Sequence, residues 1–240
     1  MYYKVINKMF VKYNKIISTK NENYGKYLQN ITKQQLEMFE LIAKLDEKLN
    51  FGVDLYHSIW NNLARFGGKY IDIIEEYDEN PILLSVLLQN KKHTNKIYKN
   101  QIFNIITKIK NTLVGVNYDQ QWSVPQPLWN GTRFWEYLFE RVRVTNFKDK
   151  VSRLDSYFLF KSIDDCKCYM ETRNITDDIV KVEIIEAENI FEYDMMFMEN
   201  IENHYTIKMI NENINKYWNK EFTSNPLIEV LLNGKFKIVK

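Results

Sequence analysis

The C-terminal stretch PLIEVLLNGKFKIVK constrains the fold most, because a run so rich in Leu, Ile and Val is typical of a strand. Asn233-Gly234 is the dipeptide that favours a two-residue type I′ turn, so the stretch predicts a terminal hairpin. The side-chain period of two places Ile228, Val230 and Leu232 on one face, and Leu227, Glu229 and Leu231 on the other. Glu229 is therefore a carboxylate on an otherwise apolar face of a strand.

Two interpretations of Glu229 are open at this point. The carboxylate can be partly buried or lie in a cleft that uses its charge, at a cost in desolvation. Alternatively, the hairpin lies at the edge of a sheet, where a solvent-facing glutamate discourages pairing with other strands. Taken alone, the stretch favours the edge hairpin.

The composition is typical of a folded protein whose net charge is close to zero. Of 240 residues, 45% are hydrophobic, and 33 Lys and Arg balance 31 Asp and Glu to a formal charge of +2. This balance gives no argument for nucleic acid or an acidic membrane as a partner. Cys166 and Cys168 are too close together for a useful disulfide, which suits a reducing compartment. With no signal-peptide core and no apolar run near the roughly 20 residues that span a bilayer, we expect a cytoplasmic protein without a membrane partner.

The first half of the chain predicts helices. Apolar residues between 2 and 17 recur at three- and four-residue spacing, and the other side carries lysines. We expect this helix to pack on its own domain, with contact to anionic lipid or nucleic acid as the alternative. A capping box formed by Thr32 and Gln35 starts a second helix that ends near residue 50. Residues 1–50 are therefore predicted to be an N-terminal helical region.

The second half mixes short strands with helices, which predicts an α+β fold rather than repeated parallel units. The predicted strands are 153–160, 178–185, 190–197 and the terminal hairpin, and the predicted helices are 134–143, 204–218 and one that Ser162 caps, running through Cys166 and Met170.

Several chemistries have no motif in this sequence. The seven glycines form neither GxGxxG nor a P-loop, so phosphate would have to be held by side chains. His57, His93 and His204 lack zinc-like spacing to each other and to the cysteines, and we expect no metal site. No GxSxG motif is present.

Three stretches taken in order resemble a known superfamily: the FERVR helix, VSRLDSYFLFKSIDD, and KYWNKEFTSNPLIEVLLNGKFKIVK. Together they resemble the ADP-ribosyltransferase fold, and most of all small bacterial and phage-associated ADP-ribosyltransferase-like domains. The resemblance covers roughly residues 51–240 and is strongest from about 134 onward. It implies an ADP-ribosyltransferase-like split β-sheet domain at 51–240, with a helical insertion at about 69–113 if His57 belongs to this domain. If His57 does not belong to it, the first half of the chain is a separate helical domain.

The resemblance implies an enzyme that uses NAD as its ADP-ribose donor. Glu229 matches the catalytic glutamate, and Ser156 matches a serine that orients it. Arg153 and Arg143 are candidates for binding the NAD phosphates, because guanidinium groups bind phosphate oxygens through directed paired bonds. For Arg143 the alternative is a surface pair with Glu140 on its own helix.

Two further groups complete the implied NAD site. Tyr157 or Phe158 is a candidate for stacking on nicotinamide, although aromatic residues on strands more commonly form core. His57, followed by Gly67-Gly68, resembles the strand and turn that open these domains near the adenosine ribose. A histidine satisfied by the backbone is the equal alternative.

One departure from the superfamily bears on the acceptor. Members that modify arginine carry a Glu or Gln two positions before the catalytic glutamate, where this chain has Leu227. Arginine is therefore disfavoured, and the acceptor is a protein side chain, a nucleobase or water. The resemblance implies a toxin, an effector or a phage-defence protein, with an antitoxin or inhibitor protein as a possible partner. The alternative function is a non-catalytic protein that binds RNA or a partner protein through its lysine-rich segments.

Overall fold

The computed structural model describes residues 1–28, 132–201 and 205–239, together with Leu36, Phe39, Glu40, Ala43 and Glu47. The chain forms two compact units, each described by itself. Unit 1 comprises Met1–Asn30, Leu138–Ile201 and Asn211–Lys240, and unit 2 comprises Ile31–Tyr137 and Glu202–Ile210. His57 and the insertion expected at about 69–113 lie outside the described residues.

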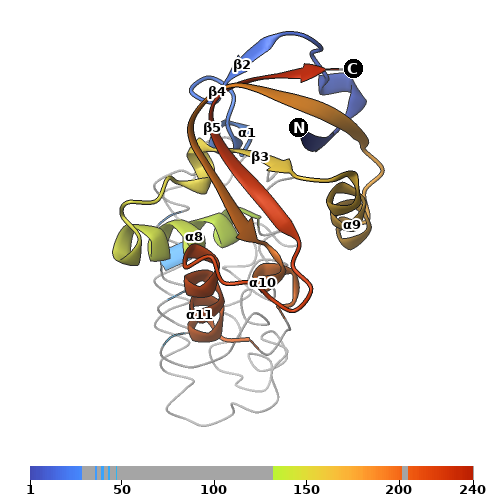
Figure 1. Ribbon diagram of the computed structural model, residues 1–240. Helices are drawn as coiled ribbons and strands as arrows, with labels where there is room; N and C mark the ends of the chain where they lie inside the picture. The colour runs from blue at the N-terminus through green and yellow to red at the C-terminus, as the bar shows by residue number, and fades with distance from the viewer. Residues whose placement is uncertain are drawn as a thin grey trace, which may run out of the picture. The chain divides into compact units, whose positions relative to one another are not determined.

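Unit 1 contains a small antiparallel barrel. Its strands are β1 (Tyr2–Ile6), β2 (Ile16–Ser18), β3 (Tyr157–Phe160), β4 (Asp178–Asp194) and β5 (Ile228–Val239). They are paired in the order β2-β5-β3-β1-β4, and β4 also pairs with β5. This last pairing closes β3, β1, β4 and β5 into a four-stranded barrel. Figure 1 shows β4 (orange) and β5 (red) side by side as a long antiparallel pair.

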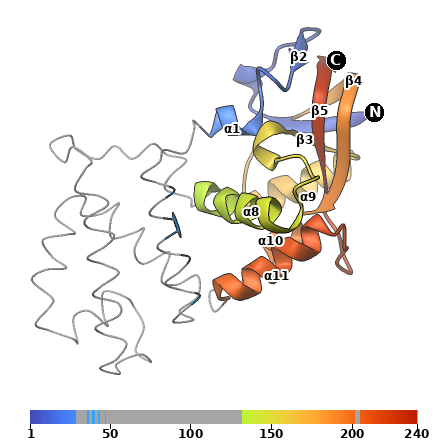
Figure 2. The same cartoon turned by 90° about the vertical axis from the view of Figure 1, so that its left-hand side faces the viewer.

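Helices surround this barrel, so the α+β prediction is confirmed. They are η1 (Lys8–Phe10), α1 (Tyr24–Tyr27), α8 (Thr132–Asn146), η2 (Arg153–Asp155), α9 (Ile163–Arg173), α10 (Met196–Glu199) and α11 (Ile207–Trp218). Figure 2 shows the same elements from the side. No helix of the described residues is long and apolar enough to span a bilayer.

The alternation predicted for the last strand is confirmed, because the two faces of β5 enter different cores. Val230 and Leu232 belong to the barrel interior with Leu159 and Phe236. Leu227, on the other face, packs in a second cluster, whose buried members are Val5, Phe160, Cys166 and Met195. Glu229 shares the face of Leu227 and therefore points away from the barrel interior.

In unit 2, Phe39 and Ala43 are helical and fully buried, in line with the helix predicted there. The Phe39 ring lies 5.4 Å from the ring of Phe134 and 5.6 Å from that of Tyr137. The Tyr137 hydroxyl donates a hydrogen bond to Glu40.

The helix predicted for residues 2–17 is wrong. These residues form β1, the short η1 turn and β2, and β1 lies between β3 and β4. Tyr, Val and Ile favour strands, and their spacing along the chain happens to suit a helix as well. Pairing with strands more than 150 residues away decides between the two.

The terminal hairpin is also wrong, because β5 continues through Asn233 and Gly234 without turning back. Gly234 has φ +147°, and a Cβ there would lie 2.0 Å from the Glu186 carbonyl oxygen. The opposing part of β4 carries two register irregularities, between Ile184 and Glu186 and between Ala187 and Asn189. The glycine thus serves a close approach of two strands at a bulge rather than a turn. The two strands predicted at 178–185 and 190–197 form the single strand β4 as far as Asp194, and Met196 and Phe197, also predicted as strand, begin α10 instead.

The helices predicted in the second half of the chain are confirmed as α8, α9 and α11, and one predicted strand segment, just before β3, is helical instead. Ser162 caps α9, where its Oγ accepts a hydrogen bond of 3.0 Å from the Asp165 N–H. Cys166 is buried and Cys168 is exposed, and both are free thiols, in line with the prediction that they form no disulfide. Residues 153–155, predicted as strand, form η2 instead, because the Ser152 side chain caps a turn there.

Candidate functional site

Glu229 is buried near the start of β5, between two neighbouring strands. It lies opposite Phe160 of β3 on one side and Tyr193 of β4 on the other, and only 5% of the residue is exposed. The interpretation as an edge-strand charge is therefore wrong. A carboxylate in this position needs compensation by charge and hydrogen bonds.

Arg153 and Tyr217 provide that compensation. Nη1 of Arg153 forms an ion pair with Oε1 of Glu229, and the Tyr217 hydroxyl donates to the same oxygen at 2.7 Å. Nη1 also donates to the Tyr217 hydroxyl oxygen at 2.5 Å. Oε2 accepts no hydrogen bond from the described residues, and it is not among their fully buried unpaired atoms. One carboxylate oxygen is thus fixed, and the other keeps contact with solvent.

Three aromatic rings surround the Arg153 guanidinium. Its Cζ lies 4.4 Å from the ring centre of Phe139, 4.7 Å from that of Phe158 and 5.2 Å from that of Tyr217. The faces of such rings attract cations, and they also exclude water from the ion pair. We call Arg153, Glu229, Tyr217, Phe139 and Phe158 the Glu229 cluster.

Tyr193 and Trp218 support the cluster from β4 and α11. The Tyr193 ring stacks on that of Tyr217 at 4.5 Å and 21°. Tyr193 is fully buried, its hydroxyl has no partner among the described residues, and burial raises its pKa to about 12. The Trp218 indole N–H donates to the Phe139 carbonyl at 3.3 Å. The ring that orients Glu229 is therefore held between a strand and two helices.

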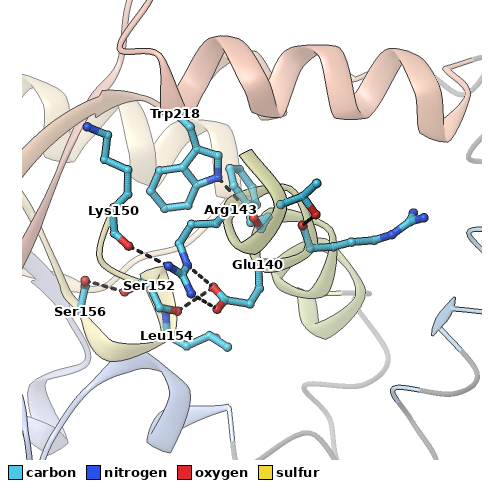
Figure 3. A network of polar contacts seen from close by, with 10 residues as sticks. Glu140, Arg143, Lys150, Ser152, Leu154, Ser156 and Trp218 are labelled. Carbon is cyan, nitrogen blue, oxygen red and sulfur yellow. Dashed lines mark hydrogen bonds and ion pairs between the residues drawn. The ribbon is translucent and has the colours of Figure 1, made fainter. Parts of the chain in front are cut away.

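Arg143 does not join the Glu229 cluster but braces the turn that precedes Arg153 (Figure 3). Its guanidinium binds both oxygens of Glu140, at 2.9 and 2.6 Å, and the Lys150 carbonyl at 2.8 Å. The Ser152 hydroxyl donates to Glu140 at 2.9 Å and accepts from the Leu154 N–H at 3.1 Å. The hydrogen bonds that Arg143 donates to the Glu140 carboxylate raise the pKa of Arg143. The structure thus shows the alternative given for Arg143 in the sequence analysis, a pair with Glu140 on the same helix.

Ser156 is also placed away from Glu229. Its hydroxyl donates to the Ser152 carbonyl at 2.9 Å and lies 3.4 Å from Oδ1 of Asn233. In the β3–β5 register Phe160 faces Glu229, whereas Ser156 lies four residues earlier, about 13 Å along the strand. The structure therefore gives Ser156 a role in tying η2 to β5 and no contact with the carboxylate.

The two aromatic candidates for stacking on nicotinamide fall on opposite faces of β3. Phe158 lies in the Glu229 cluster and contacts the ring of Tyr24 edge-on at 4.6 Å. Tyr157 packs in the barrel instead, 4.3 Å from the Phe236 ring, and burial raises its pKa to about 12. The ammonium of Lys4 lies 4.9 Å from the Tyr157 ring centre, and burial lowers the pKa of Lys4 to about 8.

Asp194, which the sequence interpretation did not single out, fixes the segment that leads into Glu229. It is fully buried, and its Oδ1 accepts from the N–H groups of Met196 and Leu227, both at 3.0 Å. Its Oδ2 accepts from the N–H and the hydroxyl of Thr223, both at 2.7 Å. This carboxylate therefore fixes Leu227, which directly precedes β5 and lies two residues before Glu229.

The described residues contain no group of three or more His, Cys, Asp or Glu side chains that could hold a metal ion. What they assemble is a buried carboxylate with one oriented oxygen, one oxygen without a hydrogen bond from the described residues, and a guanidinium enclosed by aromatic rings. Such a group can stabilise positive charge that develops beside it.

Comparison with known families gives one match. Residues 2–240 match a protein family described as Protein of unknown function (DUF2441). A search of curated proteins finds no match.

Proposed function

Since the chain belongs to the DUF2441 family, whose description states no activity, we propose a function from the Glu229 cluster and the superfamily resemblance together. The protein is an NAD-dependent ADP-ribosyltransferase. It cleaves the bond between nicotinamide and ribose and transfers ADP-ribose to a macromolecule. Glu229 is the catalytic carboxylate.

One observation carries the proposal. Of the residues that the resemblance singled out, Glu229 from one stretch lies together with Arg153 and Phe158 from another, with Arg153 on Glu229 and over the Phe158 ring. Ser156, Arg143 and Tyr157 lie away from these three. Arg153 and Glu229 are 76 residues apart in the chain. If the ion pair between Arg153 and Glu229 had only a structural role, its residues would have no reason to match the superfamily, whereas a shared catalytic site gives such a reason.

The geometry supports a specific role for each group. Loss of nicotinamide leaves an oxocarbenium-like ribose, and a carboxylate fixed beforehand offsets that charge without reorganising. Tyr217 fixes Oε1, so Oε2 is the oxygen that accepts a hydrogen bond from a ribose hydroxyl. Arg153 leaves the carboxylate when the donor enters, and its guanidinium then binds a phosphate oxygen of NAD.

The finer fold and the acceptor are parts of the same proposal. The barrel of unit 1 is a variant of the split β-sheet core of ADP-ribosyltransferases. Leu227 is 2% exposed and packs among apolar residues, so no acid beside Glu229 activates an acceptor guanidine. The acceptor is therefore a protein side chain other than arginine, or a nucleobase. The setting is a toxin, effector or phage-defence protein that an antitoxin or inhibitor protein restrains.

The experiment measures nicotinamide released from NAD by the purified protein, with cell lysate as a source of acceptors. The wild type is compared with Glu229→Gln and with Glu183→Gln, a matched change on β4 at a half-exposed glutamate that pairs with Lys237 at 3.0 Å. Release by the wild type and by Glu183→Gln, with loss in Glu229→Gln, supports the proposal. If the wild type releases no nicotinamide but binds RNA or a lysate protein, the non-catalytic binding function takes its place.

A further inference from the structure

Residues 7–15, which join β1 to β2, and Ile16, the first residue of β2, form a structured turn, and we call residues 7–16 the N-terminal turn. Oδ1 of Asn7 accepts from the Met9 N–H at 3.1 Å, and the Asn7 carbonyl accepts from the Phe10 N–H at 2.9 Å. At the other end, the Asn14 N–H donates to the Ile238 carbonyl at 2.8 Å. The conformation of the tip is thus fixed by hydrogen bonds at both ends.

The fixed tip directs apolar side chains outward. Met9 is 84% exposed, Phe10 66%, Ile16 59% and Tyr13 46%. Between them, Val11 packs against the barrel core and anchors the turn. Scattered exposed apolar residues need no explanation, but several on one rigid turn mark a contact surface.

The same turn carries only positive charge. Residues 1–21 contain five lysines and no Asp or Glu, and the three within the turn, Lys8, Lys12 and Lys15, are all exposed. Lys12 pairs with Glu22 at 3.2 Å. Lys8 and Lys15 have no ion pair within the described part of the chain. Exposed lysines therefore flank the exposed apolar side chains of the turn.

We propose that the N-terminal turn binds the surface of membranes that contain anionic phospholipids. Met9 and Phe10 enter the boundary between headgroups and acyl chains, and Lys8, Lys12 and Lys15 contact the headgroup phosphates. This interaction is independent of the ADP-ribosyltransferase proposal, because it uses a surface that shares no residue with the Glu229 cluster.

Two observations favour lipid over nucleic acid as the occupant. Single-stranded nucleic acid uses aromatic rings and cations, and here two of the three most exposed side chains, Met9 and Ile16, are aliphatic. Aliphatic groups gain from an acyl layer and nothing from a phosphate or a base edge. The sequence alone favoured packing of residues 2–17 on their own domain, because it predicted a helix whose apolar side would be covered. The observed strand and turn leave that apolar side uncovered at Met9 and Phe10.

The test is co-sedimentation of the full chain with phosphatidylcholine vesicles, with and without phosphatidylglycerol. We expect binding only with the anionic lipid. Lys8→Gln/Lys15→Gln should weaken it about fivefold per lysine, and high salt should act in the same direction. Met9→Ser/Phe10→Ser should weaken it at least about tenfold, since two large apolar groups are lost. All four positions are exposed, and circular dichroism checks that the fold is retained.

Matched controls use equivalent side chains elsewhere. Phe222→Ser changes an aromatic residue that is 55% exposed, and Lys148→Gln/Lys208→Gln removes two exposed lysines. Both controls should bind as the wild type does. The proposal is overturned if vesicles do not bind, if the controls lose as much binding as the turn variants, or if the turn variants instead lose binding of an RNA oligonucleotide or self-association measured by light scattering.

Discussion

The ion pair between Arg153 and Glu229 should dominate the local energetics of unit 1, and a double-mutant cycle measures it. Arg153→Met leaves the Glu229 carboxylate, 6% exposed, with the Tyr217 hydroxyl as its donor. Breaking a buried pair on one side costs about 3–5 kcal/mol. Because the Arg153 side chain is still 11% exposed, we expect the lower end, about 3 kcal/mol. Glu229→Gln leaves a guanidinium without its counter-charge and should cost a similar amount.

The double variant Arg153→Met/Glu229→Gln should be less destabilised than the sum of the two single variants. It removes both charges, and the glutamine oxygen can still accept from Tyr217. We expect a coupling energy of about 2 kcal/mol, measured by urea unfolding at neutral pH with an unchanged m-value. The exposed pair of Glu183 and Lys237, 3.0 Å apart, is the control, and its coupling should be below about 1 kcal/mol.

Additive single variants would refute this account. If Arg153→Met/Glu229→Gln lost the sum of the two single losses, the two charges would be acting independently, each through its own surroundings. The same conclusion would follow if Arg153→Met alone cost less than about 1 kcal/mol, the value of an exposed pair. Glu229 would then be solvated in solution, against its burial between β3 and β4.

Three further predictions concern residues around the cluster. Asp194→Asn should cost about 3 kcal/mol in urea unfolding, because an amide cannot accept the hydrogen bonds that converge on both carboxylate oxygens. Under the proposed function, Ser156→Ala should leave nicotinamide release within about twofold of wild type, because its hydroxyl donates to the Ser152 carbonyl and does not contact the Glu229 carboxylate; a loss as deep as that of Glu229→Gln contradicts this. The pKa of Lys4 is lowered from 10.5 to about 8, so the unfolded chain binds more protons above pH 8 and stability should rise with pH there. Lys4→Met should flatten this rise in stability with pH and should raise the melting temperature at neutral pH. The measurement is made below pH 9, because burial raises the pKa of the Cys166 thiol from 9.0 to about 12 and this thiol lowers stability as the pH rises above 9.

The parts of the fold that depend on near neighbours could be predicted from the sequence. Ser162 and Asp165 are three residues apart, and they define the start of α9 without help from the rest of the chain. The alternation of Val230 and Leu232 against Leu227 and Glu229 is likewise a local property of one strand, and it placed Glu229 on the correct face.

The parts that depend on distant pairing could not be predicted. Residues 2–6 combine residue types that favour strands with a spacing that suits a helix. They form a strand because they pair with β3 and β4, which are distant in the sequence. Asn233-Gly234 has the composition of a turn, but the partner strand β4 continues past it. Tyr193 and Tyr217 belong to no local motif. Their positions beside Glu229 follow from the β4–β5 register and from the packing of α11, neither of which the sequence states.

The place of β5 also sets when unit 1 can be completed during synthesis. β5 pairs with β2 near the start of the chain and with β3 and β4 later in it, and the Thr19 N–H donates to the Gly234 carbonyl. Of the strands in the barrel, β5 leaves the ribosome last, after the segment of unit 2 that lies between residues 31 and 137. A nascent chain that stops before residue 228 has Arg153 and Tyr217 but neither the carboxylate nor a closed barrel. The Glu229 cluster therefore assembles only after β5 has been synthesised, and a chain that ends earlier is left with unpaired strand edges.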